Sequence, residues 1–142
     1  MSKPSPALVD ALFRLSFVLQ GHLVRLAAAH DLSLVQLRLL GILRDREPGM
    51  LELARHLELE KSSSSGLIDR AEARGLVERV PSKEDRRAAT VRMTARGRKL
   101  ARALEDEVSR ELGALLAVLS EPERVKLTAL VERVVERAKP PA

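Results

Sequence analysis

The segment from Lys61 to Thr94 constrains the fold most, because its apolar periodicity changes within a few residues. From Lys61 to Arg74 the apolar residues have the spacing of an α-helix, and Gly75 follows, where a helix end favours glycine. Two runs then alternate with a period of two and are predicted to be strands: Leu76–Val80 and Ala89–Met93. The basic loop Lys83–Arg87 separates them. The segment therefore predicts a helix followed by a hairpin with a charged tip.

The remaining chain is predicted to be helical. Leucines at spacings of three and four predict one long helix over residues 7–29, and similar stripes predict helices over 34–46, 50–57, 95–119 and 121–138. Ser33 with Gln36, and Ser120 with Glu123, have the spacing of capping boxes at two of the helix starts. Thr94 is a candidate cap for the helix from residue 95. The fold class is therefore mainly α with a small β-wing, and 142 residues predict a single domain over 1–142.

Composition excludes several kinds of site. The chain has no cysteine, so disulfides, thiolate metal sites and cysteine redox sensing are impossible. It has only two aromatic residues, Phe13 and Phe17, and no glycine-rich phosphate loop. His22, His30 and His56 are not spaced with carboxylates as metal-binding pairs. We therefore predict a protein that is not an enzyme and holds no metal and no cofactor.

No uninterrupted apolar run approaches the roughly 20 residues that a membrane span needs, and the first residues lack the apolar core of a signal peptide. These features predict a cytoplasmic protein without a membrane partner.

The positive charge is concentrated in one part of the chain. The net charge is +5, but residues 61–102 contain twelve Lys or Arg against five Asp or Glu, a local net charge of +7. Such a concentration favours a polyanionic partner. With the predicted helix and hairpin, it points to double-stranded DNA.

Residues 50–57 and 61–74 have the order of a helix-turn-helix, in which the start of the second helix enters the major groove. The four serines at its start span one turn, so at least one side chain should face the protein. Arginines at the hairpin tip can enter a minor groove, and Asp85 can pair with one and fix its direction. We assign DNA contacts to Ser62, Ser63, Ser64, Ser65, Arg70, Lys83, Asp85, Arg86 and Arg87. A solvated helix start and an ordinary charged hairpin tip are the alternative interpretations.

Residues 33–102 resemble the multiple-antibiotic-resistance regulator (MarR) family of winged helix-turn-helix transcription factors. The resemblance is carried by Leu53-Ala54-Arg55-His56-Leu57, Lys61-Ser62-Ser63, Leu67-Ile68-Asp69-Arg70, Arg74-Gly75-Leu76-Val77, Asp85-Arg86-Arg87, Val91-Arg92-Met93-Thr94 and Gly97. It implies that Arg87 inserts in the minor groove, that Asp85 buttresses it, and that Arg86 contacts a phosphate or the groove edge.

The resemblance also implies a homodimer joined by its first and last helices, about residues 7–30 and 95–138, with the winged lobe at about 33–94. Two-fold symmetry predicts a pseudo-palindromic operator with half-sites roughly 10 base pairs apart. Members of the family often sense small phenolic ligands in a cleft, for which Phe13, Phe17, His22 and the region of Arg38 are candidates. Ordinary packing is the alternative for both phenylalanines.

Two positions depart from the family pattern. Gly66 stands where a basic or polar residue is common, and Ala71 stands where a larger apolar residue is common. These departures concern base specificity more than the fold. They leave two hypotheses: a homodimeric sequence-specific regulator, expected to be a ligand-responsive repressor, and a helical interaction module that keeps the winged fold without operator binding.

Overall fold

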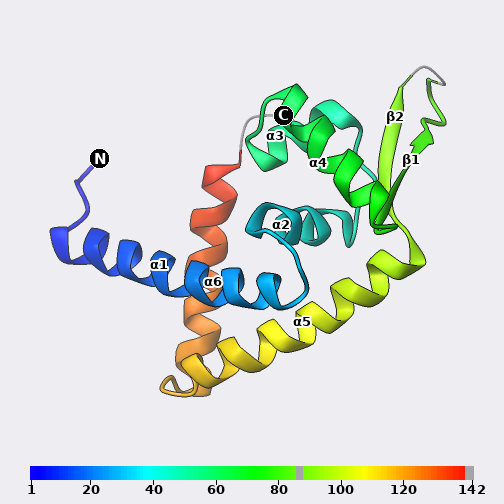
Figure 1. The fold of residues 1–142 in the computed structure, drawn as a ribbon. Helices are drawn as coiled ribbons and strands as arrows, with labels where there is room; N and C mark the ends of the chain where they lie inside the picture. Colours follow the sequence, from blue (N-terminus) through cyan, green and yellow to red (C-terminus); the bar gives the residue numbers. More distant parts are fainter. Residues whose placement is uncertain (86–87, 140–142) are drawn as a thin grey trace. The chain divides into compact units, whose positions relative to one another are not determined.

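The computed structural model describes residues 1–85 and 88–139. It contains six helices and a two-stranded wing, which confirms the predicted fold class (Figure 1). In chain order the elements are α1 (Pro6–Ala29), α2 (Leu34–Leu43), α3 (Met50–Leu57), α4 (Lys61–Ala73), β1 (Val77–Pro81), β2 (Ala89–Met93), α5 (Ala95–Leu116) and α6 (Glu121–Ala138).

The chain divides into two compact units, Met1–Val108 and Ser109–Ala142. The first unit contains α1 to α4, the wing and most of α5. The second contains the end of α5 and all of α6. In α6, no residue is buried.

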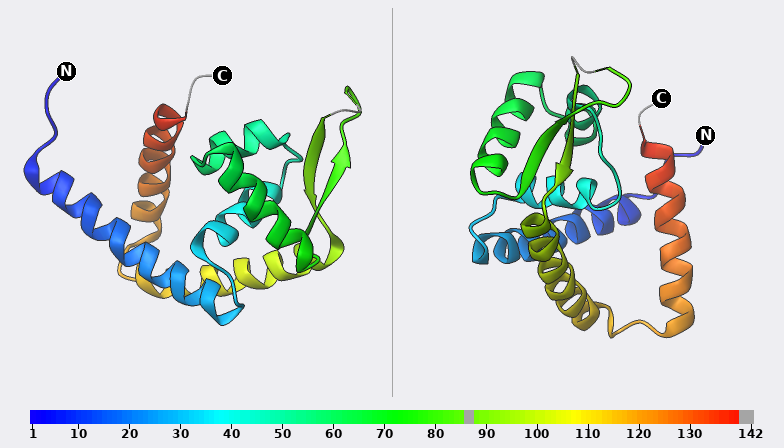
Figure 2. Two further views of the ribbon diagram at one scale, coloured as in Figure 1. Left: turned by 45° about the horizontal axis from the view of Figure 1, so that its top comes forward. Right: turned by 90° about the vertical axis from the view of Figure 1, so that its right-hand side faces the viewer.

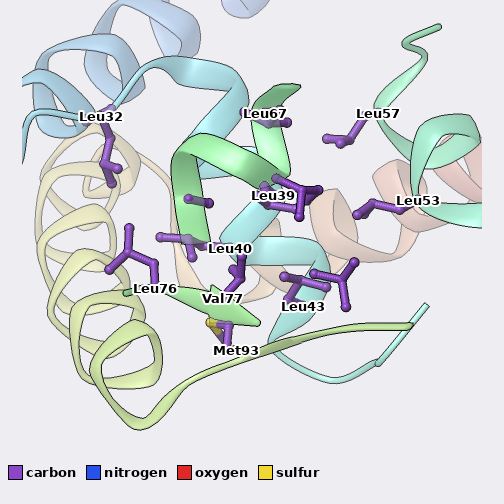
Figure 3. Packing of buried hydrophobic residues seen from close by; sticks show 14 of the residues in the cluster. Leu32, Leu39, Leu40, Leu43, Leu53, Leu57, Leu67, Leu76, Val77 and Met93 are labelled. Carbon is purple, nitrogen blue, oxygen red and sulfur yellow. The ribbon is translucent and has the colours of Figure 1, made fainter. Parts of the chain in front are cut away.

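The hydrophobic core lies within the first unit and is almost entirely aliphatic (Figure 3). Leucines of α2, α3 and α4 meet there, and Val77 and Met93 of the wing close one side. Leu39, Leu53 and Ile68 have no exposed surface. Because this core fixes α2, α3 and α4 against each other and against the wing, it also fixes the surface that α4 presents.

Helix starts with local capping signals lie where the sequence predicts them. Ser33 accepts a hydrogen bond from the Gln36 amide, and Gln36 returns one to the Ser33 amide, so the capping box of α2 is complete. The capping box of Ser120 and Glu123 is likewise complete at the start of α6.

Several boundaries differ from the prediction, those of α1 and α4 by only one residue. The second helix ends at Leu43 and not near residue 46. The first strand is shifted by one residue, to Val77–Pro81, and α5 ends at Leu116, before residue 119.

The wing is fastened to the end of α4. Gly75 has φ 72° and its amide donates to the Glu72 carbonyl, while the Leu76 amide donates to Ala71, so the helix ends in a left-handed glycine cap. Thr94 donates to the Gly75 carbonyl at 2.6 Å and accepts from the Gly97 amide at 3.0 Å. A Cβ at Gly97 would lie 2.0 Å from the Leu76 oxygen. The Thr-x-x-Gly pattern is therefore required where α5 crosses the start of the wing.

Helix α1 corrects the prediction that no segment of the chain is long and apolar enough for a membrane span. By length and composition alone α1 could cross a membrane, and none of its most apolar stretch of 18 residues is buried. The prediction considered only uninterrupted apolar runs, whereas Asp10 and Arg14 interrupt a segment whose average remains apolar. Phe13 and Phe17 are 61% and 68% exposed, so neither packs in the interior of this chain, which was the alternative interpretation for both.

Candidate nucleic-acid interface

Helices α3 and α4 form the predicted helix-turn-helix. Glu58 takes a left-handed conformation with φ 55°, and the Leu59 amide donates to the Ala54 carbonyl, so the chain reverses tightly between the helices. Figures 1 and 2 show the two strands of the wing extending beside α4. The arrangement therefore places a helix surface and a hairpin next to each other on the first unit.

The four serines of α4 divide between two environments. Ser62 and Ser63 are exposed and Ser65 is partly buried, whereas Ser64 has 0% exposure. Ser64 lies on the same helix face as Leu67, Ile68 and Ala71, which are all buried. The assignment of a DNA contact to Ser64 is therefore wrong, because its side chain is not exposed to solvent. The expectation that at least one serine faces the protein is met by this residue.

The N-terminus of α4 is not capped by any side chain. Its N-cap residue, Glu60, has an extended backbone, and no side-chain hydrogen bond is made to the first turn. The first amides of a helix are unpaired within the helix, and the helix dipole makes this end partly positive. With the hydroxyls of Ser62 and Ser63 beside them, these amides form a surface suited to a phosphate.

The wing carries its charges on two different faces. Glu78 of β1 pairs with Arg92 of β2 in the antiparallel register, and their side chains meet at 2.6 Å. The Glu78 carboxylate raises the pKa of Arg92, first through this hydrogen bond and then through its charge. One residue further along β1, Arg79 points to the other face.

Arg79 joins the wing to α4. Its guanidinium contacts Asp69 at 2.8 Å and also binds Glu72, and it donates to the Ser65 carbonyl at 3.3 Å. Arg79 was not among the predicted site residues, because its partners lie seven to fourteen positions away in another element. Two carboxylates three residues apart on α4 were the available signal. The contact fixes the wing relative to the helix and neutralises part of the acidic charge on α4.

The hairpin tip is described only in part. Lys83 and Asp85 are exposed, and the Glu84 amide donates to the Ser82 hydroxyl at 3.3 Å. The predictions for Arg86 and Arg87 fall on residues outside those that the structure describes. Arg70 is exposed on α4, on the opposite side from the core.

A second feature of the first unit is a cavity of about 560 Å³. Its walls come from α1, α2 and α5 and are mostly apolar, with five leucines, and Gln20, Arg38 and Arg44 are among the polar side chains. Arg44 donates to Glu105 at 3.1 Å, so an ion pair joins α2 to α5 at the wall. The hydrogen bond and charge of Asp45, followed by the charge of Glu105, raise the pKa of Arg44.

The cavity partly matches the predicted cleft. Arg38 lines it as expected, whereas Phe13, Phe17 and His22 are not among its lining residues. Gln20 and Leu23 are the contributions of α1 instead. Over residues 1–85 and 88–139, no three His, Asp or Glu side chains are grouped as a metal site.

Comparison with known proteins connects this geometry to a family. The MarR family model matches residues 30–88. HTH-type transcriptional regulator YfiV of Bacillus subtilis is 31% identical over 115 residues, which cover 77% of this chain and 71% of YfiV.

Two solved structures share the fold. The transcriptional repressor CouR, bound to a 23-mer DNA duplex, has a TM-score of 0.76 at 22% identity, over 95% of this chain and 99% of CouR. NadR, in complex with 4-hydroxyphenylacetate, has a TM-score of 0.76 at 23% identity, over 94% of this chain and 97% of NadR.

The YfiV relationship extends the family match beyond the winged lobe to most of the chain. Members of this family regulate transcription and are not enzymes, which confirms the prediction of a protein without catalytic activity. On its sequence and its fold, this chain belongs to the MarR family of helix-turn-helix transcription regulators.

Proposed function

We propose that the protein is a homodimeric repressor that binds a pseudo-palindromic operator, with α4 in the major groove and the wing in the minor groove. The observation that carries the proposal is the surface of α4. Its uncapped N-terminus, exposed Ser62 and Ser63, and exposed Arg70 lie beside a wing that Arg79 holds in place. The DNA complex of the similarly folded repressor CouR supports the same use of this fold.

Each DNA contact has a distinct role in this proposal. Ser62 and Ser63 bind phosphates together with the free amides of α4, and Ser65 lies at the edge beside Arg79. Lys83 and Arg86 contact phosphates near the minor groove, and Arg87 enters the groove with Asp85 fixing its direction. Base contacts from α4 supply specificity, while the phosphate contacts position the protein.

The dimer is proposed from two exposed apolar surfaces. On α1, Leu12 and Phe17 are 56% and 68% exposed, and on α6, Val131 and Val134 are 47% and 68% exposed. Apolar surfaces of this extent mark interaction sites, and a second copy of the chain would cover them. In this view residues 1–142 work as one domain, with the winged lobe at 33–94 and dimerisation helices at 7–30 and 95–138.

Membership of this regulator family implies an intracellular location, and we place the protein in the cytoplasm without a membrane partner.

The cavity between α1, α2 and α5 is proposed as the effector site. It has the size of a small-molecule pocket, mostly apolar walls and a few polar groups that can orient a ligand. The complex of NadR with 4-hydroxyphenylacetate supports a phenolic effector. An effector would cause release of the operator if it binds more tightly to a dimer in which the distance between the two α4 helices does not match the distance between the half-sites.

A competing proposal is a helical interaction module that does not bind a specific operator. The absence of a side chain at Gly66 on α4 and the modest net charge of +5 favour this alternative. The first proposal expects the protein to prefer one DNA sequence over bulk DNA, and the second expects no such preference.

The experiment is a competition between DNA fragments from the neighbourhood of the gene and bulk DNA, at several salt concentrations. A regulator should prefer one fragment, with an affinity that falls steeply with salt because phosphate contacts release counterions.

Lys83→Ala should weaken binding to all fragments about equally and reduce the salt dependence. Arg87→Ala should weaken binding substantially and leave the dimer intact. If no fragment outcompetes bulk DNA, the operator proposal fails and the interaction module stands. Repeating the competition with small phenolic acids tests the effector site.

A further inference from the structure

Gly66 is partly buried and lies on the side of α4 that carries the exposed residues Ser62 and Arg70. Ser62 and Arg70 lie four residues before and after it, so the three positions are stacked along one side of the helix. Gly66 lies within a regular helix, and its φ is not among the positive φ values of the chain. The backbone therefore does not require glycine here, although glycine destabilises a helix interior relative to alanine. A different feature must explain the missing side chain.

The space at Gly66 is occupied by the side chain of Arg70. A Cβ built on Gly66 would lie 3.3 Å from Nη1 of Arg70, and apart from the chain neighbours and the backbone of α4 itself no other described atom lies within 4 Å. Long side chains in a helix point back toward its N-terminus, over the residue four positions earlier. The Arg70 guanidinium thus lies along the helix surface above Gly66, close to the end of α4 that enters the groove.

The same guanidinium keeps its donors available. Among the described residues, no hydrogen bond or ion pair of the Arg70 side chain is found. The nearby carboxylates of Asp69 and Glu72 are bound by Arg79 of the wing. Arg79 therefore leaves Arg70 with a full set of planar N–H donors on the outward face.

We propose that Gly66 and Arg70 act as one specificity-determining unit that reads a guanine in each half-site. This inference rests on the proposed operator binding and deepens it. The guanidinium can donate two parallel hydrogen bonds to O6 and N7 of guanine in the major groove. The absence of a side chain at Gly66 lets the guanidinium lie flat and lets the helix backbone approach the bases. In this proposal the departure at Gly66 accommodates a base contact, and it therefore no longer favours the interaction module over operator binding.

The test measures base preference at every operator position, by sequencing the DNA that the intact dimer selects from a randomised pool. Arg70→Lys keeps the charge but loses the planar pair of donors. It should lower the preference for guanine at one position of each half-site by roughly 5- to 150-fold. Affinity for bulk DNA should change by less than about twofold, since the charge is retained.

Gly66→Ala should have two opposite effects. Its Cβ would require the guanidinium to shift by a few tenths of an ångström, so the preference for guanine should weaken at the same position that Arg70→Lys affects. Alanine also favours the helix, so the midpoint of thermal unfolding should rise. In the Arg70→Lys background, Gly66→Ala should cause no further loss of preference, because the two residues act through one contact.

The matched control is Arg102→Lys, the same chemical change at an exposed position on α5, which should leave every base preference unchanged. If the guanine preference survives Arg70→Lys, this inference is wrong and the proposed operator binding still stands. The same conclusion follows if Gly66→Ala changes the preference at a different base position. If the unsubstituted dimer has no base preference at all, the proposed operator binding fails and this inference fails with it.

Discussion

At the scale of single residues, Ser64 shows how a helix face decides the role of a side chain. Its hydroxyl is completely buried and has no hydrogen-bond partner among the described residues. Burying an unpaired hydroxyl costs about 1–3 kcal/mol. Ser64→Ala should therefore stabilise the protein by about 1 kcal/mol, as measured by urea unfolding, without lowering operator affinity. The matched change at exposed Ser63 should give no such gain. A loss of operator affinity in Ser64→Ala would contradict its placement in the core.

The four adjacent serines also show what the sequence could and could not predict. The spacing of Ser64 from Leu67, Ile68 and Ala71 is enough to place it on the apolar face, because helical periodicity is local. Arg79 could not be found in this way. Its role depends on a strand folding back against Asp69 and Glu72, which no local pattern encodes.

At the scale of whole elements, the start of α6 predicts a pH dependence. The Ser120 amide, followed by the Ser120 side chain, hydrogen-bonds Glu123 and lowers the pKa of its carboxyl below the ordinary value of 4.5. A carboxyl whose pKa is lowered by folding stabilises the folded state above its unfolded pKa. This stabilisation is lost as the pH falls through the lower, folded pKa. Glu123→Gln should therefore lower the unfolding midpoint at neutral pH and have little effect in acid. An equal effect at all pH values would contradict the charged capping box.

Elements with such local signals begin where the sequence predicts, as α2 and α6 do. Boundaries without a cap depend on contacts with distant residues. The strand β1 begins one residue late and ends at Pro81, because its limits are set by pairing with β2 and not by its own alternation. The segment before Met50 shows a further non-local effect. Pro48 accepts a hydrogen bond from the Val91 amide, and Gly49 bridges to Thr90, so a predicted helix break also supports the wing.

At the scale of the whole molecule, sequence patterns identified the apolar faces but not the cavity. The stripes on α1 and α6 are visible as repeats of leucine and valine. The cavity instead requires Gln20, Arg38 and Glu105 from three helices to meet, which depends on the tertiary arrangement of the first unit. For the same reason, Phe13, Phe17 and His22 were only candidates for the cleft that the family resemblance implies, whereas Gln20 and Leu23 of α1 line the cavity.

The apolar faces lead to a prediction about assembly. Val131 is 47% exposed on α6, and Arg133 lies outside the apolar stripe of the same helix. Val131→Glu would bury an unpaired charge in the proposed dimer, so its dissociation constant should rise roughly 100-fold or more in sedimentation experiments. Arg133→Glu introduces the same side chain and should leave the dimer intact.

Val131→Glu should also lower the affinity for the operator, because a dimer that contacts two linked half-sites binds more tightly than two separate monomers. Helix α1 offers an independent check, since its length and composition would also suit a membrane. If a second copy covers this face, the unsubstituted protein should be a dimer without detergent and should not sediment with lipid vesicles. A monomer that binds vesicles would show that the apolar face of α1 serves a membrane, and the two α4 helices would then need another means of reaching both half-sites.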